Sequence, residues 1–175
     1  MARAAIHALA RRAGSLDIQA FRDACTNFAT GVAVATVQAP DGSLHGLTVS
    51  SFTPVSTEPP LILICIDHGF SSLQHFRACA NFGVNILAES QREIAVSFAE
   101  KDDNRFDGVD AYLTTGGAPF LRGSLAAMEC SLEAIIEAGD HAIFLAEVVH
   151  TESDKGSPLI YFQRGYRSMA QHNPT

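Results

Sequence analysis

The spacing of apolar residues changes along the first third of the chain. Between residues 16 and 28 they recur every three or four positions, which predicts an amphipathic helix over residues 17–29. The β-branched run 32–37 that follows predicts a strand. Because Pro-Asp-Gly at 40–42 favours a tight turn, a second strand is expected over residues 44–53.

The rest of the chain mixes short strands and helices in no regular order. Residues 61–66 form an uninterrupted apolar run, which predicts a strand buried on both faces. Residues 101–117 are charged and rich in turn formers, so a long surface loop is expected there. The other expected elements are strands over 82–87, 124–137, 141–150 and 159–162, and helices over 71–78 and 91–99.

These elements amount to about six or seven strands and three helices, without regular βαβ alternation. That order favours a mostly β fold, an antiparallel barrel with peripheral α-helices, over a doubly wound parallel sheet. Neither a repeat nor a linker divides the sequence, so one domain is expected over residues 17–170, with a short tail at 171–175. Residues 1–16 contain three arginines and no acid, and a basic, solvated or dimer-embracing arm is expected there, with an Arg-rich presequence as the alternative.

Composition narrows the class of protein. Apolar residues make up 47% of the 175 positions and charged residues 18%, which is typical of a folded domain. The 19 acidic and 12 basic residues leave a net charge of −7, which disfavours nucleic acid as a partner. No apolar run reaches the roughly 18 residues that a membrane helix needs, so no membrane partner is expected.

The four cysteines are not spaced like metal ligands. Cys25, Cys65, Cys79 and Cys130 form no CxxC pair and have no histidine at ligand spacing, so no metal site is expected. Three of them, Cys25, Cys65 and Cys130, lie among apolar residues. We expect these three to be small core residues of a cytoplasmic protein, with redox or metal chemistry as the alternative.

Motif searches exclude several classes of enzyme. GxGxxG after a strand, GxxxxGK[ST], GxSxG and HExxH are all absent, which leaves no support for a Rossmann site, a P-loop, a hydrolase elbow or a zincin. The acidic segment 103–110 superficially resembles a calcium loop. Placing Gly108 at its turn puts Arg105 and Thr114 where ligand oxygens belong, so a solvated loop is expected.

The strongest local signal is a strand of small hydroxyl side chains, GLTVSSF, which starts at Gly46. Because side chains alternate along a strand, Thr48 and Ser50 share one face while Val49 and Ser51 share the other. Such hydroxyls and backbone groups can bond the edge of a flat heteroaromatic ligand, and glycine permits its close approach. The same composition also suits a plain strand, because threonine and serine are common strand residues.

Two turns are further candidates. The loop DHGFSS ends in Ser71 and Ser72 at an expected helix start, where serines either cap the helix or bind a phosphate. Gly139, Asp140 and His141 lie between two long strands. His141 either positions a ligand, if this turn faces a cleft, or is an ordinary exposed imidazole.

Taken in order, the fragments resemble one known family. They are NFATGVAVATV (27–37), HGLTVSSFTPVSTEPPLILICID (45–67), FGVNIL (82–87), SFA (97–99), NRFDGV (104–109), GDHAIFLAEV (139–148) and PLIYFQRGYR (158–167). This pattern resembles the short-chain flavin reductases of the FMN-binding split-barrel class, over roughly residues 18–170. The resemblance implies a split β-barrel, a homodimer with its flavin cleft near the subunit boundary, and service as the reductase component of a two-component monooxygenase.

The resemblance also implies a site. The strand from Gly46 would contact the isoalloxazine ring, the segment 65–67 the ribityl chain, and the serines at 71 and 72 the phosphate. The flavin-site residues so implied are Gly46, Thr48, Val49, Ser50, Ser51, Cys65, Ile66, Asp67, Ser71, Ser72, Asn85, Phe98 and Arg105. The nicotinamide-site residues so implied are His141, as the catalytic residue, with Tyr161, Arg164, Tyr166 and Arg167.

The implied activity is NAD(P)H:flavin oxidoreduction, in which hydride passes from NADH or NADPH to FMN or FAD for a separate oxygenase. Hydride transfer between stacked rings needs no strong acid or base, which agrees with a sequence that offers no nucleophile or triad. Gln163 interrupts the family's terminal YxRGxY pattern, and the choice between FMN and FAD stays open. The alternative is a flavin- or haem-binding module without nicotinamide turnover. A hydrolase using Asp140 and His141 has little support.

Overall fold

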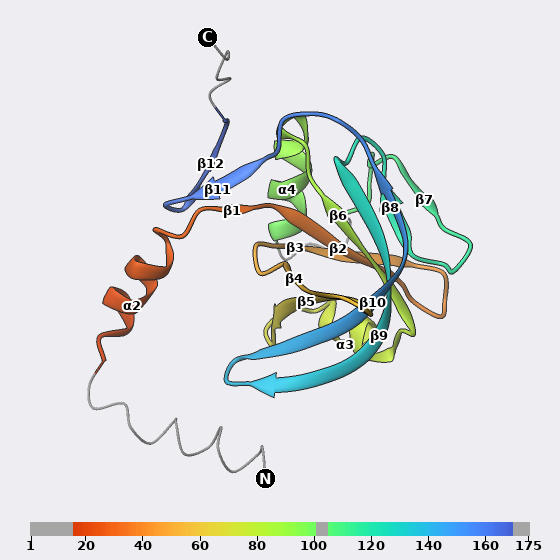
Figure 1. The fold of residues 1–175 in the computed structure, drawn as a ribbon, viewed down its shortest axis with the longest axis horizontal. Helices are drawn as coiled ribbons and strands as arrows, with labels where there is room; N and C mark the ends of the chain where they lie inside the picture. The colour runs from red at the N-terminus through yellow and green to blue at the C-terminus, as the bar shows by residue number, and fades with distance from the viewer. Residues whose placement is uncertain (1–15, 101–104, 170–175) are drawn as a thin grey trace.

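The computed structural model describes residues 16–100 and 105–169, so the expected arm at 1–16 (except Leu16) and the tail at 171–175 lie outside the described residues. The described strands form antiparallel sheets of seven, three and two strands (Figure 1). The helices are α2 (Ile18–Cys25), α3 (Leu73–Ala78) and α4 (Arg92–Ala99), with a 3-10 turn η1 (Glu89–Gln91). The strands are β1 (Thr30–Gly31), β2 (Ala33–Gln38), β3 (Leu44–Val49), β4 (Thr53–Thr57), β5 (Pro60–Asp67), β6 (Asn81–Ile86), β7 (Ala111–Leu113), β8 (Pro119–Leu121), β9 (Ala126–Ala138), β10 (His141–Ser153), β11 (Ile160–Phe162) and β12 (Gly165–Arg167). The predicted mostly β, antiparallel fold is confirmed.

The β2–β3 hairpin forms where the sequence predicts it. Gly42 has a φ of +87°, which glycine adopts without the steric cost of a Cβ. The Asp41 carboxylate accepts the backbone N–H of Ser43 at 3.0 Å, and the N–H of Ala39 donates to the Ser43 carbonyl at 2.8 Å. Local turn chemistry therefore fixes the register of β2 against β3.

The seven-stranded sheet closes into a barrel between two strands that follow one another in the chain. The order is β3-β2-β6-β9-β10-β5-β4, so β3 and β4 are the two edge strands although they are consecutive in the chain. The link of residues 50–52 joins these edges without pairing in any ladder, and we call it the seam. The barrel is thus closed by a covalent link where backbone pairing stops.

The barrel interior is filled by aromatic and branched side chains. Phe76 of α3, Phe82 of β6 and Phe144 of β10 are fully buried and meet edge to face, with ring centroids 5.9 to 6.5 Å apart. A second cluster places Phe98 of α4 against Val34 of β2. Burying each such side chain contributes about 1.5–3 kcal/mol, and Leu47 and Val49 of β3 belong to the same core, which holds this edge of the seam in place.

Strand β5 buries one face, so the prediction of a strand buried on both faces is wrong. Ile62, Ile64 and Ile66 point into the core, whereas Leu61, Leu63 and Cys65 are half-buried on the opposite face. That outer face continues onto β10, because Cys65 pairs with Ile143 and Leu63 with Leu145. The sequence pattern misleads here because the uncovered face is as apolar as the core face.

Other elements differ from the prediction in length. Helix α2 ends at Cys25 rather than 29, because the Asn27 amide and the Thr26 hydroxyl both donate to the Asp23 carbonyl. Cys25 is exposed, so the expectation of a core cysteine there is wrong. The expected strand 44–53 stops at residue 49. The described part of the expected loop 101–117 contains β7, and the described strands exceed the expected number because short edge strands lack a clear alternation.

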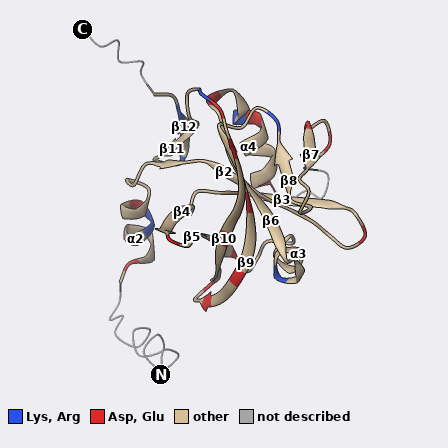
Figure 2. Cartoon of the chain, turned by 45° about the vertical axis from the view of Figure 1, so that its right-hand side comes forward, with Lys and Arg blue, Asp and Glu red and all other residues tan. Residues whose placement is uncertain are grey.

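In the described ranges, no helix combines the length and the apolar character needed to cross a membrane. Acidic side chains lie along the β9–β10 hairpin (Figure 2). They include Glu133, Glu137 and Asp140, which agrees with the net charge of −7.

Candidate functional site

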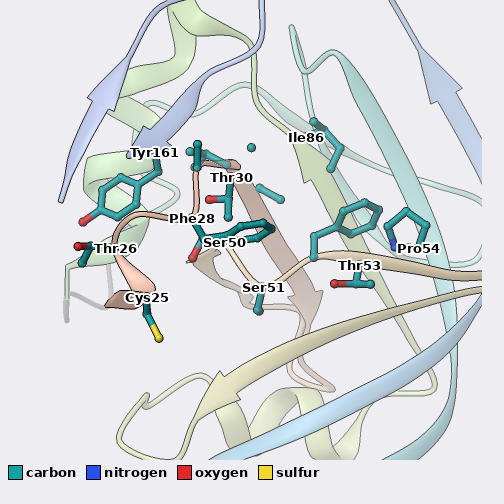
Figure 3. A pocket seen from close by; sticks show the side chains of 15 residues that line it. Cys25, Thr26, Phe28, Thr30, Ser50, Ser51, Thr53, Pro54, Ile86 and Tyr161 are labelled. Carbon is teal, nitrogen blue, oxygen red and sulfur yellow. The ribbon is translucent and has the colours of Figure 1, made fainter. Parts of the chain in front are cut away.

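An apolar groove of about 760 Å³ lies at the seam. One wall is the segment 25–33, which leads from α2 into β2, and the other is the segment 50–54 (Figure 3). Tyr161 of β11 and Ile86 of β6 complete the lining. Small-molecule sites are typically concave and apolar, at about 300–1,000 Å³, so this groove has the size and character of one.

The groove contains few polar groups, among them the hydroxyls of Ser50 and Thr30. Ser50 is exposed at the seam, and its side chain lines the groove. The Thr30 hydroxyl is buried, yet it has no hydrogen-bond partner. Leaving a buried hydroxyl unpaired costs about 1–3 kcal/mol, so a ligand with a polar edge that reached Thr30 would recover that energy. The lining therefore fits a flat aromatic ligand with polar edge atoms.

Two other predicted hydroxyls are used to hold the structure. The Ser51 hydroxyl accepts the N–H of Cys65 at 2.8 Å and donates to its carbonyl at 3.0 Å, so it replaces the missing ladder between the seam and β5. Burial raises the pKa of the Cys65 thiol, and the hydrogen bond with Ser51 partly opposes this. The Thr48 hydroxyl donates to the Ala95 carbonyl at 2.7 Å and fixes α4 against β3.

Ser72 and Arg105 meet behind Gly46. Arg105 is 5% exposed, and its Nη1 donates to the Gly46 carbonyl and to the Ser72 hydroxyl, both at 3.0 Å. Its Nε donates to the Glu100 carbonyl at 2.7 Å, whereas Nη2 is buried without a partner. Among the described ion pairs none involves Arg105. A buried guanidinium without a carboxylate favours an anion nearby.

Of the two alternatives for these serines, helix capping is not observed for Ser72. Ser72 occupies the N-cap position of α3 without a side-chain cap bond, because its hydroxyl donates to the Gly46 carbonyl at 3.4 Å instead. Ser71 is exposed beside it.

Four of the implied flavin-site residues lie in the core. Val49, Ile66 and Phe98 are buried among apolar side chains. Asn85 is fully buried, and its amide oxygen accepts the N–H of Leu121 at 2.8 Å. Strand alternation turns Val49, Ile66 and Asn85 inward, and Phe98 lies on the buried face of α4, so none of the four lines the groove at the seam.

The implied nicotinamide residues fall into two groups. His141 lies at the start of β10, where its Nδ1 is 2.7 Å from Asp140 Oδ1, and this hydrogen bond lowers the pKa of Asp140. It pairs across the sheet with Asp67, whose exposed carboxylate accepts the N–H of Gly69 at 2.6 Å. Asp67 is two residues beyond Cys65, so His141 shares the outer sheet face that begins at the seam.

The second group lies on β11 and β12. Tyr161 lines the groove and packs edge to face on Tyr166, with centroids 5.5 Å apart. Arg164 instead pairs with Asp23 of α2 at 2.7 Å, and Arg167 is exposed. Figures 1 and 2 place these strands at the opposite end of the molecule from the β9–β10 turn, so one chain does not bring them to His141.

The sequence analysis did not identify the wall formed by Phe28 and Thr30. Phe28 is 77% exposed beside the groove, although its helical spacing resembled that of a core position. The break after Cys25, marked by Thr26 and Asn27, is the signal that would have separated this wall from the helix. Within the described ranges, no three or more His, Cys, Asp or Glu residues are arranged to hold a metal.

A small antiparallel barrel with an apolar groove of this size at its seam has the form of a small-molecule-binding protein. Residues 25–170 match the model of the flavin reductase like domain, and the chain belongs to this family. The predicted resemblance is confirmed.

The chain is also similar to individual proteins over most of its length. The chain is 39% identical over 150 residues to an actinorhodin polyketide dimerase of Streptomyces coelicolor, covering 85% of this chain and 84% of that one. It is 34% identical to the reductase component of a 4-nitrophenol 4-monooxygenase/4-nitrocatechol 2-monooxygenase of Rhodococcus opacus, covering 85% and 79%. The solved NADH:FAD oxidoreductase SgcE6 of Streptomyces globisporus C-1027, in complex with NAD and FAD fragments, superposes with a TM-score of 0.85 at 33% identity, covering 93% and 100%. The chain spans about half of one further relative, at 48% of its length.

Proposed function

We propose that this chain is an NAD(P)H:flavin oxidoreductase that reduces FMN or FAD with NADH or NADPH. The observation that carries the proposal is the apolar groove at the seam, with the unpartnered Thr30 hydroxyl in its wall. Its membership of the flavin reductase like family supports this function over a binding module without nicotinamide turnover.

The flavin ring lies in the groove, between the segment 25–30 and the seam. Ser50 and Thr30 bond its polar edge, while Phe28 and Tyr161 cover its apolar surface. Ser51 acts indirectly, because its hydroxyl is committed to Cys65 and holds the seam at a fixed distance from β5. Flavin, when bound, supplies the hydride-accepting chemistry, and the residues of this chain supply position and exclude water.

The anionic end of the flavin is held near Ser72 and Arg105. The buried Nη2 of Arg105 lacks a partner, and the Ser72 hydroxyl lies 3.0 Å from Nη1 of the same guanidinium. A phosphate oxygen there would neutralise a buried cation and satisfy the orphaned N–H group. Ser71, exposed at the same turn, offers a further donor.

His141 orients the nicotinamide. It is held by Asp140 at 2.7 Å, and it stands at the end of the outer sheet face, two strand positions from Cys65. A nicotinamide between His141 and the flavin would lie flat on the ring, as hydride transfer requires. Tyr161 acts from the opposite side of the groove.

The chain acts as a homodimer with a separate oxygenase as the user of reduced flavin. Leu61, Leu63, Ile143 and Leu145 form an uncovered apolar face, which a second copy would bury. The name of the Rhodococcus opacus relative supports the oxygenase partner. The four free cysteines are consistent with a reducing cytoplasm.

Mixing the protein with NADH or NADPH and FMN or FAD should decrease the absorbance at 340 nm. His141→Ala should lower nicotinamide turnover more than flavin affinity. Retained flavin binding without any loss of absorbance, in all four pairings, would favour the binding-module alternative. Absence of both binding and turnover would reject the groove as a flavin site.

A further inference from the structure

Helix α2 leads into the groove wall, which its last residue Cys25 begins, but the helix itself is not packed onto the barrel. None of its residues is buried, and Ile18 and Phe21 are 59% and 54% exposed. Figure 1 shows it standing away from the sheet, joined to β2 through the segment that forms the groove wall. Among the residues that the structure describes, hydrophobic packing therefore does not determine where the helix lies.

Polar contacts from the β11–β12 turn hold the end of α2. Arg164 Nη2 donates to Asp23 Oδ1 at 2.7 Å, and the Gln163 side-chain amide donates to the Asn27 side-chain oxygen at 2.9 Å. The backbone N–H of Gln163 also donates to the Thr26 carbonyl at 3.0 Å. We call Asp23, Asn27, Gln163 and Arg164 the latch.

The backbone of the turn is strained in a way that serves these contacts. Gln163 and Arg164 have φ values of 48° and 60°, in the left-handed region that residues with a Cβ adopt at a cost. A hairpin turn of this kind is normally made with Asn-Gly, which would be relaxed but would lack the long side chains that reach α2. Strain at both positions thus accompanies direct contact with the helix end.

We infer that the latch positions the wall at residues 25–30 and thereby sets the affinity of the groove for flavin. Asp23, Gln163 and Arg164 are positioning residues in this inference, which rests on the proposed function. The latch contacts residues 23–27, immediately before Phe28 and Thr30 in the wall. The next part of the wall is held by β1, in which Thr30 pairs with Tyr161 of β11. Releasing the latch would leave the wall held by the short β1–β11 ladder alone.

The inference gives Arg164 a different task from the nicotinamide contact that the family resemblance implies. Its guanidinium is paired with the carboxylate of Asp23, and both side chains are 58% exposed. A nicotinamide contact would affect the KM for NADH, whereas the latch would affect the Kd and the KM for flavin. The two tasks are therefore separable by steady-state kinetics.

The test compares Asp23→Ala, Arg164→Ala and the double variant in the full-length protein. Oxidised FMN and FAD are titrated by fluorescence without nicotinamide, and the KM values for flavin and NADH are measured. Each single variant should raise the flavin Kd about two- to fivefold, the range expected for one exposed ion pair. The double variant should add little, because both substitutions remove the same contact. The turnover number at saturating flavin should stay unchanged.

Two further variants separate positioning from general damage. Exchanging the charges, Asp23→Arg with Arg164→Asp, should restore part of the flavin affinity. The control is Arg122→Ala. Arg122 is another exposed arginine, its Nε lies 3.3 Å from Asp110 Oδ1, and neither residue lines the groove. This variant should leave flavin binding unchanged. Unchanged flavin Kd in both single variants, additive losses, or a rise confined to the KM for NADH would each overturn the inference.

Hydrogen exchange of the ligand-free protein provides a readout that does not depend on flavin. Amides of residues 18–31 should exchange faster in Arg164→Ala than in the parent, while those of the β9–β10 hairpin should not change. If the parent binds no flavin but this difference is present, the proposed function fails and the latch as a structural element stands. If exchange is unchanged, the latch inference itself is wrong.

Discussion

Replacing Asn85 with alanine tests whether this buried amide is structural or holds a cofactor. Its Nδ2 donates to the Val34 carbonyl and to the Thr36 hydroxyl, both at 3.1 Å, and its Oδ1 accepts the Leu121 N–H at 2.8 Å. Leu121 is 2% exposed, so water cannot replace the lost acceptor. The contacts tie β2, β6 and β8 together, and none of them reaches the groove lining.

The expected cost follows from these contacts. Leaving one buried N–H unsatisfied and removing the amide volume together cost about 2–4 kcal/mol. For a chain of this length that corresponds to a fall in Tm of about 5–15 °C. Asn81→Ala is the matched control, because this residue of the same strand is only half-buried and its two hydrogen bonds are 3.3 Å long. It should cost under about 1 kcal/mol.

The assay combines thermal unfolding of the ligand-free variants with flavin titration at a temperature where each is folded. Asn85→Ala should melt early but bind flavin with the parent's affinity per folded molecule. A variant that melts within about 2 °C of the parent and binds flavin ten times more weakly would refute the structural role and return Asn85 to the cofactor site.

Three further outcomes follow from the structure. Gly46→Ala should lower stability by about 1–3 kcal/mol in urea unfolding, because its Cβ would lie 2.7 Å from Phe98 Cε1; an unchanged midpoint would contradict this packing. Under native conditions at pH 8, alkylation followed by mass spectrometry should modify the exposed Cys25 first and spare Cys130, because burial raises the pKa of the Cys130 thiol to about 12. Equal rates of modification would mean that the core opens readily. Ile143→Glu should shift the protein to a monomer in light scattering while its circular dichroism stays native, and a monomeric parent would reject the apolar sheet face as an interface.

Local chemistry accounts for the parts of the fold that the sequence predicted. The turn at 40–42, the start of α2 and the long hairpin around Gly139 each depend on residues close together in the chain. The Asp17 carboxylate accepts the N–H of Gln19 at 2.8 Å, as a helix cap should. Gly139 has a φ of +66°, which explains the break between β9 and β10.

The site was predicted less completely because it depends on distant contacts. Ser51 and Ser50 are adjacent and chemically alike, yet one is bonded to Cys65 and the other faces the groove. Arg105 lay in an expected surface loop, and its burial beneath Gly46 follows from packing that spacing alone does not encode. The latch joins Arg164 to a residue 141 positions earlier, a separation that no local pattern reports.

The two edge strands of the main sheet meet through three linked residues, with one serine hydroxyl in place of a ladder. An extra residue inserted in this link would widen the mouth of the barrel without breaking any strand pairing elsewhere. Such an insertion would change the width of the groove at the expense of the Ser51 hydrogen bonds to Cys65, while the core side chains stay packed. In this fold, the seam is therefore both the place where an extra residue would leave the strand ladders intact and the place that sets the width of the ligand groove.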